Sequence, residues 1–406
     1  MNILFVHNNL PAQFRGLIDA YRRDPAVRMA AVGSASSRPM RGVRLQKYRL
    51  AGANVADTHP FARRFDLECR RAEQVLYCLS SLTASGFRPD VILAHPGWGE
   101  TLPLRTFFPD ARIALYCEFF YGVEGRDVGF DPEFPEAGLD GHISLHLKNA
   151  STLLGLSDCD VGISPTPWQR STFPEHFRDK IEVIHEGVDT DLVAPDAAAT
   201  FRLPNGCVVS HGDQVITFVA RNLEPLRGYH VFMRALPRVL AALPDAQVIV
   251  VGGEEASYGM KPPNGQSWKR LFLDEVAPRI DLDRVHFTGR LPYRRFLSAL
   301  QVSAAHVYLT YPFVLSWSLI EAMSAGCVVI GSDTAPLQDV IDGRNGLLVP
   351  FFDVEAIADR IVAAVSRPER YRAMRARARA FVRDRYDAAR VCIPQMQKRL
   401  EGLLHG

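Results

Sequence analysis

Residues 215–228 read VITFVARNLEPLRG, an apolar run that ends in a turn carrying two arginines and a glycine. The apolar part shows no alternation with polar residues, which is typical of a strand covered on both faces. We therefore expect a strand over 215–220, a turn with Arg221 and Arg227, and a helix that opens at Gly228. Arginine offers planar paired donors that suit phosphate oxygens, and a strand-to-helix turn adds backbone N–H groups. The stretch predicts a phosphate site, unless both arginines are surface residues capped by local acids.

Short apolar runs alternate with longer amphipathic segments along almost the whole chain. Helical spacing of apolar residues is clear over 231–243. Such alternation indicates parallel sheets built from right-handed crossovers. The expected strands cover 3–7, 28–32, 91–94, 113–117, 161–164, 181–185, 215–220, 247–251, 285–288, 306–309, 328–331 and 346–349.

A break in this rhythm near the middle divides the chain into two halves. Residues 191–213 contain two prolines, an Asn-Gly pair and an alanine run, and predict a linker. We expect a Rossmann-like domain over 1–195 and a second over 207–386, with a helix at about 387–406 that packs back on the first. The fold class is then α/β, with two Rossmann-like domains facing a central cleft. Ligands of such sheets bind outside the carboxyl ends of the strands.

Composition excludes several classes of protein. The 406 residues hold 47 Lys and Arg against 45 Asp and Glu, a net charge of +2 that is too balanced for a dedicated nucleic-acid binder. No apolar run approaches the roughly 18 residues of a membrane-spanning helix, and residues 1–7 lack the basic start of a signal peptide. The seven cysteines are scattered without a Cys-x-x-Cys pair, which favours reduced thiols in a cytoplasmic protein.

One segment departs from the overall charge balance. Residues 22–71 contain twelve Lys and Arg and four Asp and Glu, a net charge of +8. This is either a solvated face or a patch that contacts an anionic acceptor or an anionic membrane surface. The Arg-rich helix expected over 368–386 is interpreted as a solvated face.

A second stretch that carries chemistry covers residues 311–327, YPFVLSWSLIEAMSAGC, after the strand expected over 306–309. Ser316 or Ser318 is placed to cap a helix whose free N–H groups would face an anion. Glu321 lies one turn inside this helix, where a carboxylate can accept two hydrogen bonds from a ribose. The alternative is a core helix that carries one acid.

Together these motifs resemble the donor-binding domain of glycosyltransferase family 4, which has the GT-B fold. Arg221 and Arg227-Gly228 match the basic pair of that family, and Glu321-Ala322-Met323 matches the last glutamate of its paired-glutamate motif. The stretch Pro-Phe-Val-Leu-Ser-Trp is similar to that of a bacterial subgroup. Further matches are Glu186-Gly187-Val188-Asp189, Gly252-Gly253, Gly289-Arg290, Ala325-Gly326, Gly331-Ser332-Asp333 and Asn345-Gly346-Leu347-Leu348-Val349.

The resemblance implies retaining, metal-independent transfer of a sugar from a UDP- or GDP-linked donor, with no cofactor. Family analogy extends this to an acceptor hydroxyl in bacterial surface glycan synthesis. Arg221 and Arg227 would clamp the diphosphate and stabilise charge on the leaving group. Glu321 would hold the ribose, and the base would lie near Arg290. The other donor-binding positions are Gly253, Leu315, Ser316, Trp317 and Ser318.

The chain departs from the family pattern at four places. Arg227 stands where the family has lysine, and Phe313 stands where it has the first paired glutamate, which usually touches the donor sugar. The N-terminal glycine pair is absent, and residues 7–14 read HNNLPAQF. Glu118 replaces the histidine that ends the strand expected over 113–117.

Glu118 and His95 are the candidate catalytic residues of the first half. Both follow expected strands, so they should lie at the carboxyl edge of the first sheet. Glu118 could orient or deprotonate an acceptor hydroxyl, and His95 is a second candidate. Either residue could instead be structural, Glu118 as a buried acid satisfied by nearby amides and His95 as a strand-end histidine.

Two rival functions share these features: a sugar-nucleotide epimerase or hydrolase on the same scaffold, and a catalytically silent binding subunit. A nicotinamide oxidoreductase is disfavoured because no Gly-x-Gly-x-x-Gly follows an expected strand. Three Asp-x-Asp pairs, at 158–160, 189–191 and 281–283, do not end a strand of the donor half, so no metal site is expected. The expected partners are a nucleotide sugar and a glycan or lipid-linked acceptor, not nucleic acid.

Overall fold

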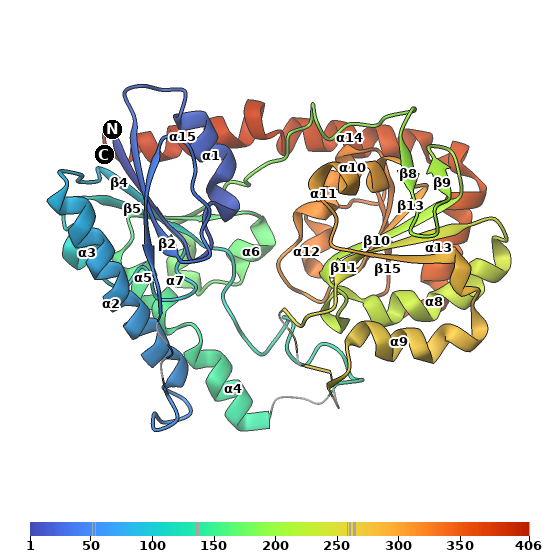
Figure 1. Ribbon diagram of the computed structural model, residues 1–406, viewed down its shortest axis with the longest axis horizontal. Helices are drawn as coiled ribbons and strands as arrows, with labels where there is room; N and C mark the ends of the chain where they lie inside the picture. The colour runs from blue at the N-terminus through green and yellow to red at the C-terminus, as the bar shows by residue number, and fades with distance from the viewer. Residues whose placement is uncertain are drawn as a thin grey trace. The chain divides into compact units, whose positions relative to one another are not determined.

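The computed structural model describes residues 1–405 except 51, 53, 135–137, 258, 260, 263 and 264. The chain divides into two compact units, which we describe one at a time (Figure 1). Unit 1 comprises Met1–Gly187 and Ala388–Gly406, and unit 2 comprises Val188–Asp387.

Unit 1 is built on a parallel sheet that has seven strands within the described residues. The order of the strands is β3-β2-β1-β4-β5-β6-β7, so β1, β4 and β5 are neighbours in the middle of the sheet. Their carboxyl ends therefore meet at one edge. The strands are β1 (Asn2–Val6), β2 (Arg28–Ser34), β3 (Val43–Tyr48), β4 (Val91–Ala94), β5 (Arg112–Tyr116), β6 (Val161–Ser164) and β7 (Ile181–Val183).

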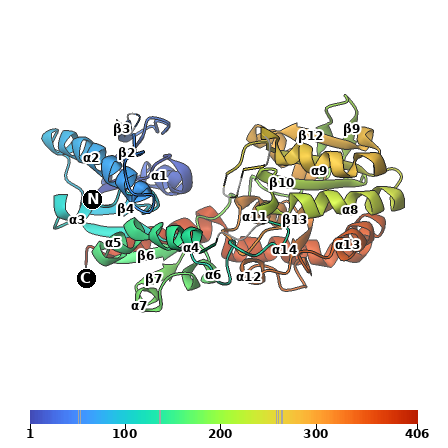
Figure 2. The same cartoon turned by 90° about the horizontal axis from the view of Figure 1, so that it is seen from below.

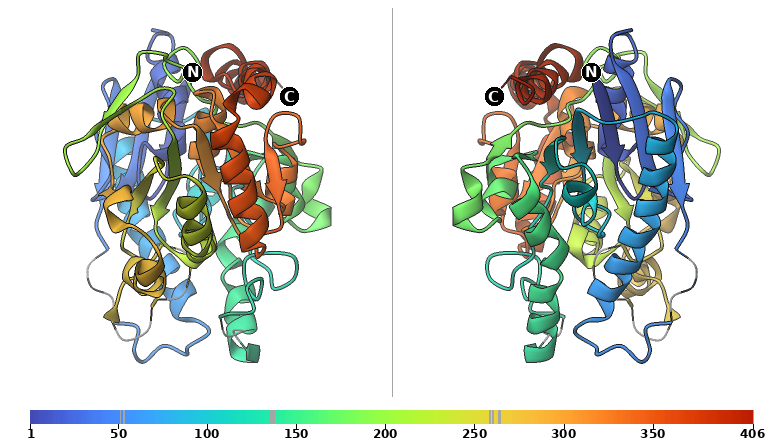
Figure 3. Two further views of the ribbon diagram at one scale, coloured as in Figure 1. Left: turned by 90° about the vertical axis from the view of Figure 1, so that its right-hand side faces the viewer. Right: turned by 90° about the vertical axis from the view of Figure 1, so that its left-hand side faces the viewer.

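Helices cover both faces of this sheet, and Figure 2 shows α1 and α2 on opposite sides of its strands. On one face, Val75 and Leu79 of α2 are buried together with side chains of α3 and α5. On the other face, Ile18 of α1 is buried with Met396 and Leu400 of α15, so the last helix of the chain belongs to unit 1 (Figure 3). The helices are α1 (Arg15–Tyr21), α2 (Arg63–Ala84), α3 (Leu104–Phe107), α4 (Gly138–Leu147), α5 (Ala150–Asp158), α6 (Pro167–Ser171), α7 (Glu175–Arg178) and α15 (Ile393–Gly402).

Unit 2 has a similar architecture around a parallel sheet of order β12-β11-β10-β13-β14-β15. Helices α8, α9 and α13 pack on one face and α10, α11 and α14 on the other (Figure 1). The strands are β8 (Thr200–Arg202), β9 (Val208–Ser210), β10 (Val215–Asn222), β11 (Gln247–Gly253), β12 (Val285–Gly289), β13 (Ala305–Tyr308), β14 (Val328–Ser332) and β15 (Leu347–Val349). The helices are α8 (Tyr229–Ala242), α9 (Trp268–Val276), α10 (Tyr293–Gln301), α11 (Trp317–Ser324), α12 (Ala335–Gln338), α13 (Val354–Ser366) and α14 (Arg372–Arg385).

Residues 191–213, which the sequence predicts to be a linker, are instead an ordered part of unit 2. They include the antiparallel hairpin of β8 and β9. Phe201 of this hairpin is buried with Val215 and Ile249 of the unit 2 sheet. Because this packing ties the segment to unit 2, the units divide at Gly187–Val188, whereas the sequence predicts that the first domain extends to residue 195.

Two expectations from the sequence, reduced cysteine thiols and the lack of a membrane-spanning helix, concern the chain as a whole. All seven cysteines are free thiols; Cys69 and Cys207 are exposed and the other five are buried. Within the described ranges, no helix has both the length and the apolar character that crossing a bilayer requires.

Candidate functional site

The carboxyl ends of β1, β4 and β5 bring His7, His95 and Glu118 together in unit 1. The ring centroids of the two histidines are 5.1 Å apart. Nε2 of His95 lies 3.4 Å from Oε2 of Glu118. The histidines are buried, whereas 31% of the Glu118 side chain is exposed, so the carboxylate reaches solvent. Three groups that are distant in the sequence thus form one cluster because their strands are adjacent in the sheet.

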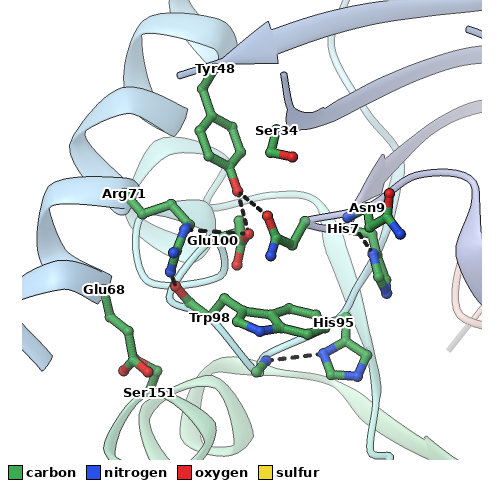
Figure 4. A network of polar contacts seen from close by, with 12 residues as sticks. His7, Asn9, Ser34, Tyr48, Glu68, Arg71, His95, Trp98, Glu100 and Ser151 are labelled. Carbon is green, nitrogen blue, oxygen red and sulfur yellow. Dashed lines mark hydrogen bonds and ion pairs between the residues drawn. The ribbon is translucent and has the colours of Figure 1, made fainter. Parts of the chain in front are cut away.

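The indole of Trp98 packs on both histidines, and Figure 4 shows it close to His95. Its ring centroid lies 4.6 Å from that of His95 and 5.2 Å from that of His7. Nδ1 of His7 accepts a hydrogen bond from the Asn9 N–H at 2.9 Å, and Nδ1 of His95 accepts one from the Gly97 N–H at 3.0 Å. A neutral His95 therefore carries its proton on Nε2, which faces the carboxylate.

Glu118 is held both at its carboxylate and at its backbone. The amide of Gln13 donates to Oε1 at 2.8 Å, and the amide of Gln169 donates to the Glu118 carbonyl at 2.7 Å. Burial alone would raise the pKa of Glu118, but the hydrogen bond and charge interaction with His95, followed by His7 and Gln13, hold it below the usual 4.5. Burial, then the nearby His95, lowers the pKa of His7 to about 3, so the His7 ring is neutral. The cluster presents an ionised acceptor of hydrogen bonds at its exposed side.

The loop after Glu118 is fixed by buried side chains that the sequence analysis did not single out. The Phe120 N–H donates to Oγ1 of Thr172 at 3.1 Å. Asn149 brackets Tyr121, accepting from its N–H and donating to its carbonyl, each at 2.9 Å. These partners come from segments 28 and 52 residues further along the chain, so no local pattern marks them.

A second buried network in unit 1 adjoins this cluster (Figure 4). Oε1 of the fully buried Glu100 accepts a hydrogen bond from the Tyr48 hydroxyl at 2.5 Å and lies 3.9 Å from Nε of Arg71. Burial raises the pKa of Glu100, although Tyr48 and Arg71 act in the opposite direction. The Tyr48 hydroxyl also lies 3.2 Å from Oδ1 of Asn8, and Arg71 donates to the carbonyl of Trp98. The network thereby ties β3 and α2 to the loops after β1 and β4.

In unit 2, Arg221 and Arg227 have different surroundings. Arg221 is exposed near the end of β10, whereas only 7% of Arg227 is exposed. The Arg227 guanidinium donates to Oγ1 of Thr310 at 3.0 Å and to the carbonyl of Val314 at 2.9 Å. It also lies 5.7 Å from the ring centroid of Phe313. Arg227 is therefore bound to the loop after β13, and Arg221 is the outer of the two guanidinium groups.

Gly228 makes the approach of Arg227 to this loop sterically allowed. It has a φ of +67°, in the left-handed region that glycine tolerates best. A Cβ atom at this position would overlap the side chain of Leu309 at the end of β13. The helix α8 begins immediately after this glycine, as the sequence predicts.

The start of α11 carries the next group of predicted donor residues. Ser316 caps the helix, its Oγ accepting from the Ser318 N–H at 3.4 Å. The carboxylate of the buried Glu321 accepts a hydrogen bond from the Tyr293 hydroxyl at 2.7 Å, a partner that the sequence analysis did not identify. Burial raises the pKa of Glu321, and the bond from Tyr293 offsets this only in part. Trp317 is 48% exposed at the helix start.

Arg290 and Gly253 meet at the carboxyl ends of β10, β11 and β12. The Arg290 guanidinium donates to Oδ1 of Asn222 at 3.0 Å and to Glu255 at 2.6 Å. A Cβ atom on Gly253 would overlap that same Asn222 oxygen and crowd Arg290. Leu315 packs at the edge of the core formed by α10, α11 and α14.

The Asp-x-Asp pairs take part in turns and ion pairs. Asp160 accepts from Arg105 at 2.7 Å and from Arg112 at 3.2 Å. Asp189 and Asp281 each accept a backbone N–H two residues further along the chain.

Two family models match the chain, one in each half. The model described as "Glycosyl transferase family 4 group" matches residues 25–193, and the model "Glycosyl transferases group 1" matches residues 213–367. The chain belongs to glycosyltransferase family 4. This family 4 glycosyltransferase is 26% identical over 298 residues to the GDP-mannose-dependent alpha-(1-6)-phosphatidylinositol monomannoside mannosyltransferase of Mycolicibacterium smegmatis, a match that covers 71% of this chain and 72% of that protein.

A shorter similarity reaches a second kind of relative. The family 4 chain is 32% identical over 186 residues to the D-inositol 3-phosphate glycosyltransferase of Mycobacteroides abscessus, covering 45% of this chain and 38% of that protein. The match therefore spans less than half the length of that relative.

Solved structures share the fold along the whole family 4 chain. Sucrose-phosphate synthase from Thermosynechococcus elongatus superimposes with a TM-score of 0.72 at 19% identity, covering 100% of this chain and 99% of that one. Anabaena HepE in complex with UDP and glucose gives a TM-score of 0.67 at 15% identity, with 99% of each chain covered. The fold is GT-B, with two Rossmann-like domains.

Proposed function

We propose that this chain is a retaining glycosyltransferase that transfers a sugar from a nucleoside-diphosphate sugar and requires no metal. The observation that best supports this is the basic pair at the carboxyl end of β10, where Arg221 is exposed in the strand and Arg227, in the turn after it, is anchored to the loop after β13. The Mycolicibacterium relative is named for its dependence on GDP-mannose, and HepE structures hold UDP or UDP-glucose. Both names describe donors of the proposed chemical class.

In this proposal, unit 2 binds the donor. Arg221 binds the diphosphate directly, and Arg227 adds charge while it fixes the loop that leads into α11. Glu321 accepts hydrogen bonds from the ribose through the carboxylate oxygen that Tyr293 leaves available. The backbone N–H groups of Leu315 and Trp317 face the phosphate or the sugar, since those of Ser316 and Ser318 are bonded to the Tyr308 hydroxyl and to Ser316 Oγ. The base lies near Arg290 and Gly253.

Unit 1 then supplies the groups that handle the acceptor. The ionised carboxylate of Glu118 orients the attacking hydroxyl and accepts its proton. His95 is a positioning residue that acts through its contact with Glu118. No protein nucleophile is required, because transfer on the face that carries the departing diphosphate depends chiefly on positioning the acceptor. By family analogy, the acceptor is a growing glycan or a lipid-linked sugar of the bacterial surface.

The basic segment suggests where such a protein works. Of the eight Lys and Arg between residues 22 and 49, all are exposed. Arg22 pairs with Asp19, and the structure shows no ion pair for the other seven within the described residues. We infer a cytoplasmic protein that contacts the anionic inner face of the membrane through residues 22–71; positions 51 and 53 lie outside the described residues.

The proposal is tested by a thermal-shift panel of UDP, GDP, ADP, CMP and NAD. At about 1 mM, a ligand present at 100 times its dissociation constant adds about 2.7 kcal/mol of stability. We expect one nucleoside diphosphate to raise the melting temperature and the Arg221→Ala variant to lose that shift. Product analysis with the matching sugar nucleotide then separates transfer from the rivals. A changed or hydrolysed donor without an acceptor would indicate an epimerase or hydrolase, and no turnover would indicate a silent subunit.

A further inference from the structure

A pocket of about 410 Å3 lies in unit 2, away from the proposed donor residues. Its walls include His211, Ser303 and Gly326, which precede β10, β13 and β14 respectively. Because these strands are parallel, the pocket lies at the amino edge of the sheet, whereas Arg221, Gly253 and Arg290 lie at or beyond the carboxyl edge. Its volume is in the range of small-molecule sites, which is about 300–1,000 Å3.

Three arginines of α14 form one wall of this pocket. Arg375, Arg379 and Arg383 are spaced by four residues, so they lie on one face of the helix. No Asp or Glu is among the described residues that line the pocket. The wall is therefore cationic; Arg383 is exposed, as expected of a solvated helix face, whereas Arg375 and Arg379 are partly buried.

Arg379 has a structural role within this wall. Its guanidinium donates to the carbonyls of Thr190, Val193 and Ser324 at 2.7–2.9 Å. Ser324 ends α11, whose carboxyl end is electrically negative, so Arg379 also offsets a field that would repel an anion. Burial and the charge of Arg383 lower the pKa of Arg379, and the charge of Asp191 opposes them only in part.

Arg375 and Arg383 have guanidinium groups with unused hydrogen-bonding capacity. Arg375 donates to the Ala304 carbonyl at 2.9 Å, but its Nε is buried without a hydrogen-bond partner. Within the described part of the chain, neither arginine forms an ion pair with a carboxylate. Burial lowers the pKa of Arg375, and the nearby Cys327 opposes this shift only in part. A bound anion in the pocket would supply the missing countercharge.

We propose that this pocket binds a small anion that carries a phosphate group, anchored by Arg375 and Arg383. The planar donors of arginine match phosphate oxygens in a paired geometry that suits this group. The volume leaves room for more than the phosphate alone, and Ser303 and the backbone near Gly326 offer polar contacts to the remainder. Because no proposed donor residue lines the pocket, the anion would not compete with the nucleotide.

The pocket nevertheless adjoins an element of the proposed donor site. Helix α11 begins at Trp317, carries Glu321 and is followed directly by Ala325 and Gly326, which line the pocket. Its eight residues span only about 12 Å. An anion in the pocket would contact the end of this helix without reaching the residues at its start.

The test is isothermal titration calorimetry on the full chain with inorganic phosphate and with glucose 6-phosphate, at constant ionic strength, with and without UDP. If inorganic phosphate binds as tightly as glucose 6-phosphate, the pocket takes the free ion. If glucose 6-phosphate binds more tightly, the pocket takes a phosphorylated metabolite. We expect Arg375→Gln/Arg383→Gln to weaken binding by about 10-fold or more, the scale of one lost charge-assisted hydrogen bond. The matched control, Arg370→Gln/Arg372→Gln, removes the same charge from positions outside the pocket and should bind as wild type does.

A second variant keeps the proposal testable if the arginine variant unfolds. Ala376 is exposed on the pocket wall, so Ala376→Trp should fill the pocket and block binding without changing any charge. The proposal is overturned if wild type binds neither probe, if the control loses as much affinity as the test variant, or if UDP displaces the probe. Since binding is measured directly, with and without UDP, a failure of the proposed transferase activity leaves this result unaffected.

Discussion

Nε2 of His95 lies 3.4 Å from Oε2 of Glu118, in a pair whose histidine is buried and whose carboxylate is 31% exposed. The Gly97 N–H occupies Nδ1 of the histidine, so the remaining ring nitrogen is directed at the carboxylate. Gln13 holds the other carboxylate oxygen at 2.8 Å. The arrangement keeps Glu118 ionised and fixed in orientation, which is what a group that orients an acceptor hydroxyl requires.

Glu118→Gln should lower kcat by about 100-fold or more, because an amide cannot take the acceptor proton. Nucleotide affinity should be unchanged, since the donor residues lie in unit 2. Steady-state kinetics together with UDP titration would measure both quantities. Glu175→Gln, at an exposed position of α7, is the matched control. A Glu118→Gln enzyme as fast as wild type would assign Glu118 a structural role.

The lowered pKa of Glu118 predicts a defined dependence of stability on pH. Its folded pKa is below its unfolded value, so its contribution to stability is fully present above about pH 4.5 and disappears as the pH falls through the lower folded pKa. Urea unfolding of wild type and Glu118→Gln between about pH 7 and pH 3 tests this. The variant should lose less stability than wild type across the acid window, and equal slopes would contradict the assignment.

The sequence predicts most of the fold because buried parallel strands are continuous apolar runs. It does not predict β3, whose six residues VRLQKY mix charged and apolar side chains at the sheet edge. The hairpin of β8 and β9 is also missed, since its Pro and Asn-Gly signals suggest a loop and only tertiary packing of Phe201 orders it. The ends of buried strands can therefore be predicted from the sequence more easily than edge strands and hairpins, which depend on tertiary packing.

The same distinction holds for the candidate site. His95 and Glu118 follow predicted strands, so their proximity can be expected from topology alone. Gln169 and Asn149, which fix the Glu118 loop, act through hydrogen bonds between distant segments that no spacing rule describes. Likewise, the sequence treats Arg221 and Arg227 as an equivalent pair, whereas burial separates their surroundings.

Arg221→Ala should reduce turnover by about 2–4 kcal/mol of transition-state stabilisation while leaving the melting temperature nearly unchanged, since the side chain is exposed. Kinetics and thermal unfolding of the same preparation would test both parts. Arg294→Ala, an exposed arginine on α10, is the control. Full activity in Arg221→Ala would remove this residue from the phosphate site.

Arg227→Ala should impair both activity and folding, because it leaves Thr310 and the Val314 carbonyl without their partner. The expected loss of stability is about 1–3 kcal/mol. Both hydrogen bonds come from Nη1, and the lysine side chain is one atom shorter, so Arg227→Lys keeps the charge but should recover stability only in part. Urea unfolding of the three proteins would show this order, and equal stability of all three would contradict the anchoring role.

Tyr48→Phe should destabilise the chain by about 1–3 kcal/mol, since it removes the hydroxyl that donates to the fully buried Glu100. Tyr77→Phe is a matched control on α2, where the tyrosine is 62% exposed and its hydroxyl lies 3.4 Å from an exposed Glu73. Denaturant unfolding should separate the two variants. If both lose equally little stability, the Tyr48–Glu100 contact has no structural weight.

The exposed Lys and Arg side chains of residues 22–49, here called the basic edge of unit 1, predict binding to anionic vesicles. Arg44 and Lys47 lie on the exposed edge strand β3. A basic residue near an anionic bilayer contributes about 1 kcal/mol, so Arg44→Gln/Lys47→Gln should weaken partitioning by about 30-fold. Flotation with phosphatidylcholine vesicles, with and without phosphatidylglycerol, would measure the effect.

Salt dependence decides whether any such binding is electrostatic. Exposed charges are screened over about 8 Å at physiological ionic strength, so binding through the basic edge should be strongest at low salt and fall as salt rises. Arg370→Gln/Arg372→Gln removes two exposed charges from unit 2 and should not change flotation. Absence of the wild-type chain from anionic vesicles at low salt would show that the basic edge is a solvated face. Binding that persists at high salt would require apolar insertion, for which the charged edge strand offers no basis.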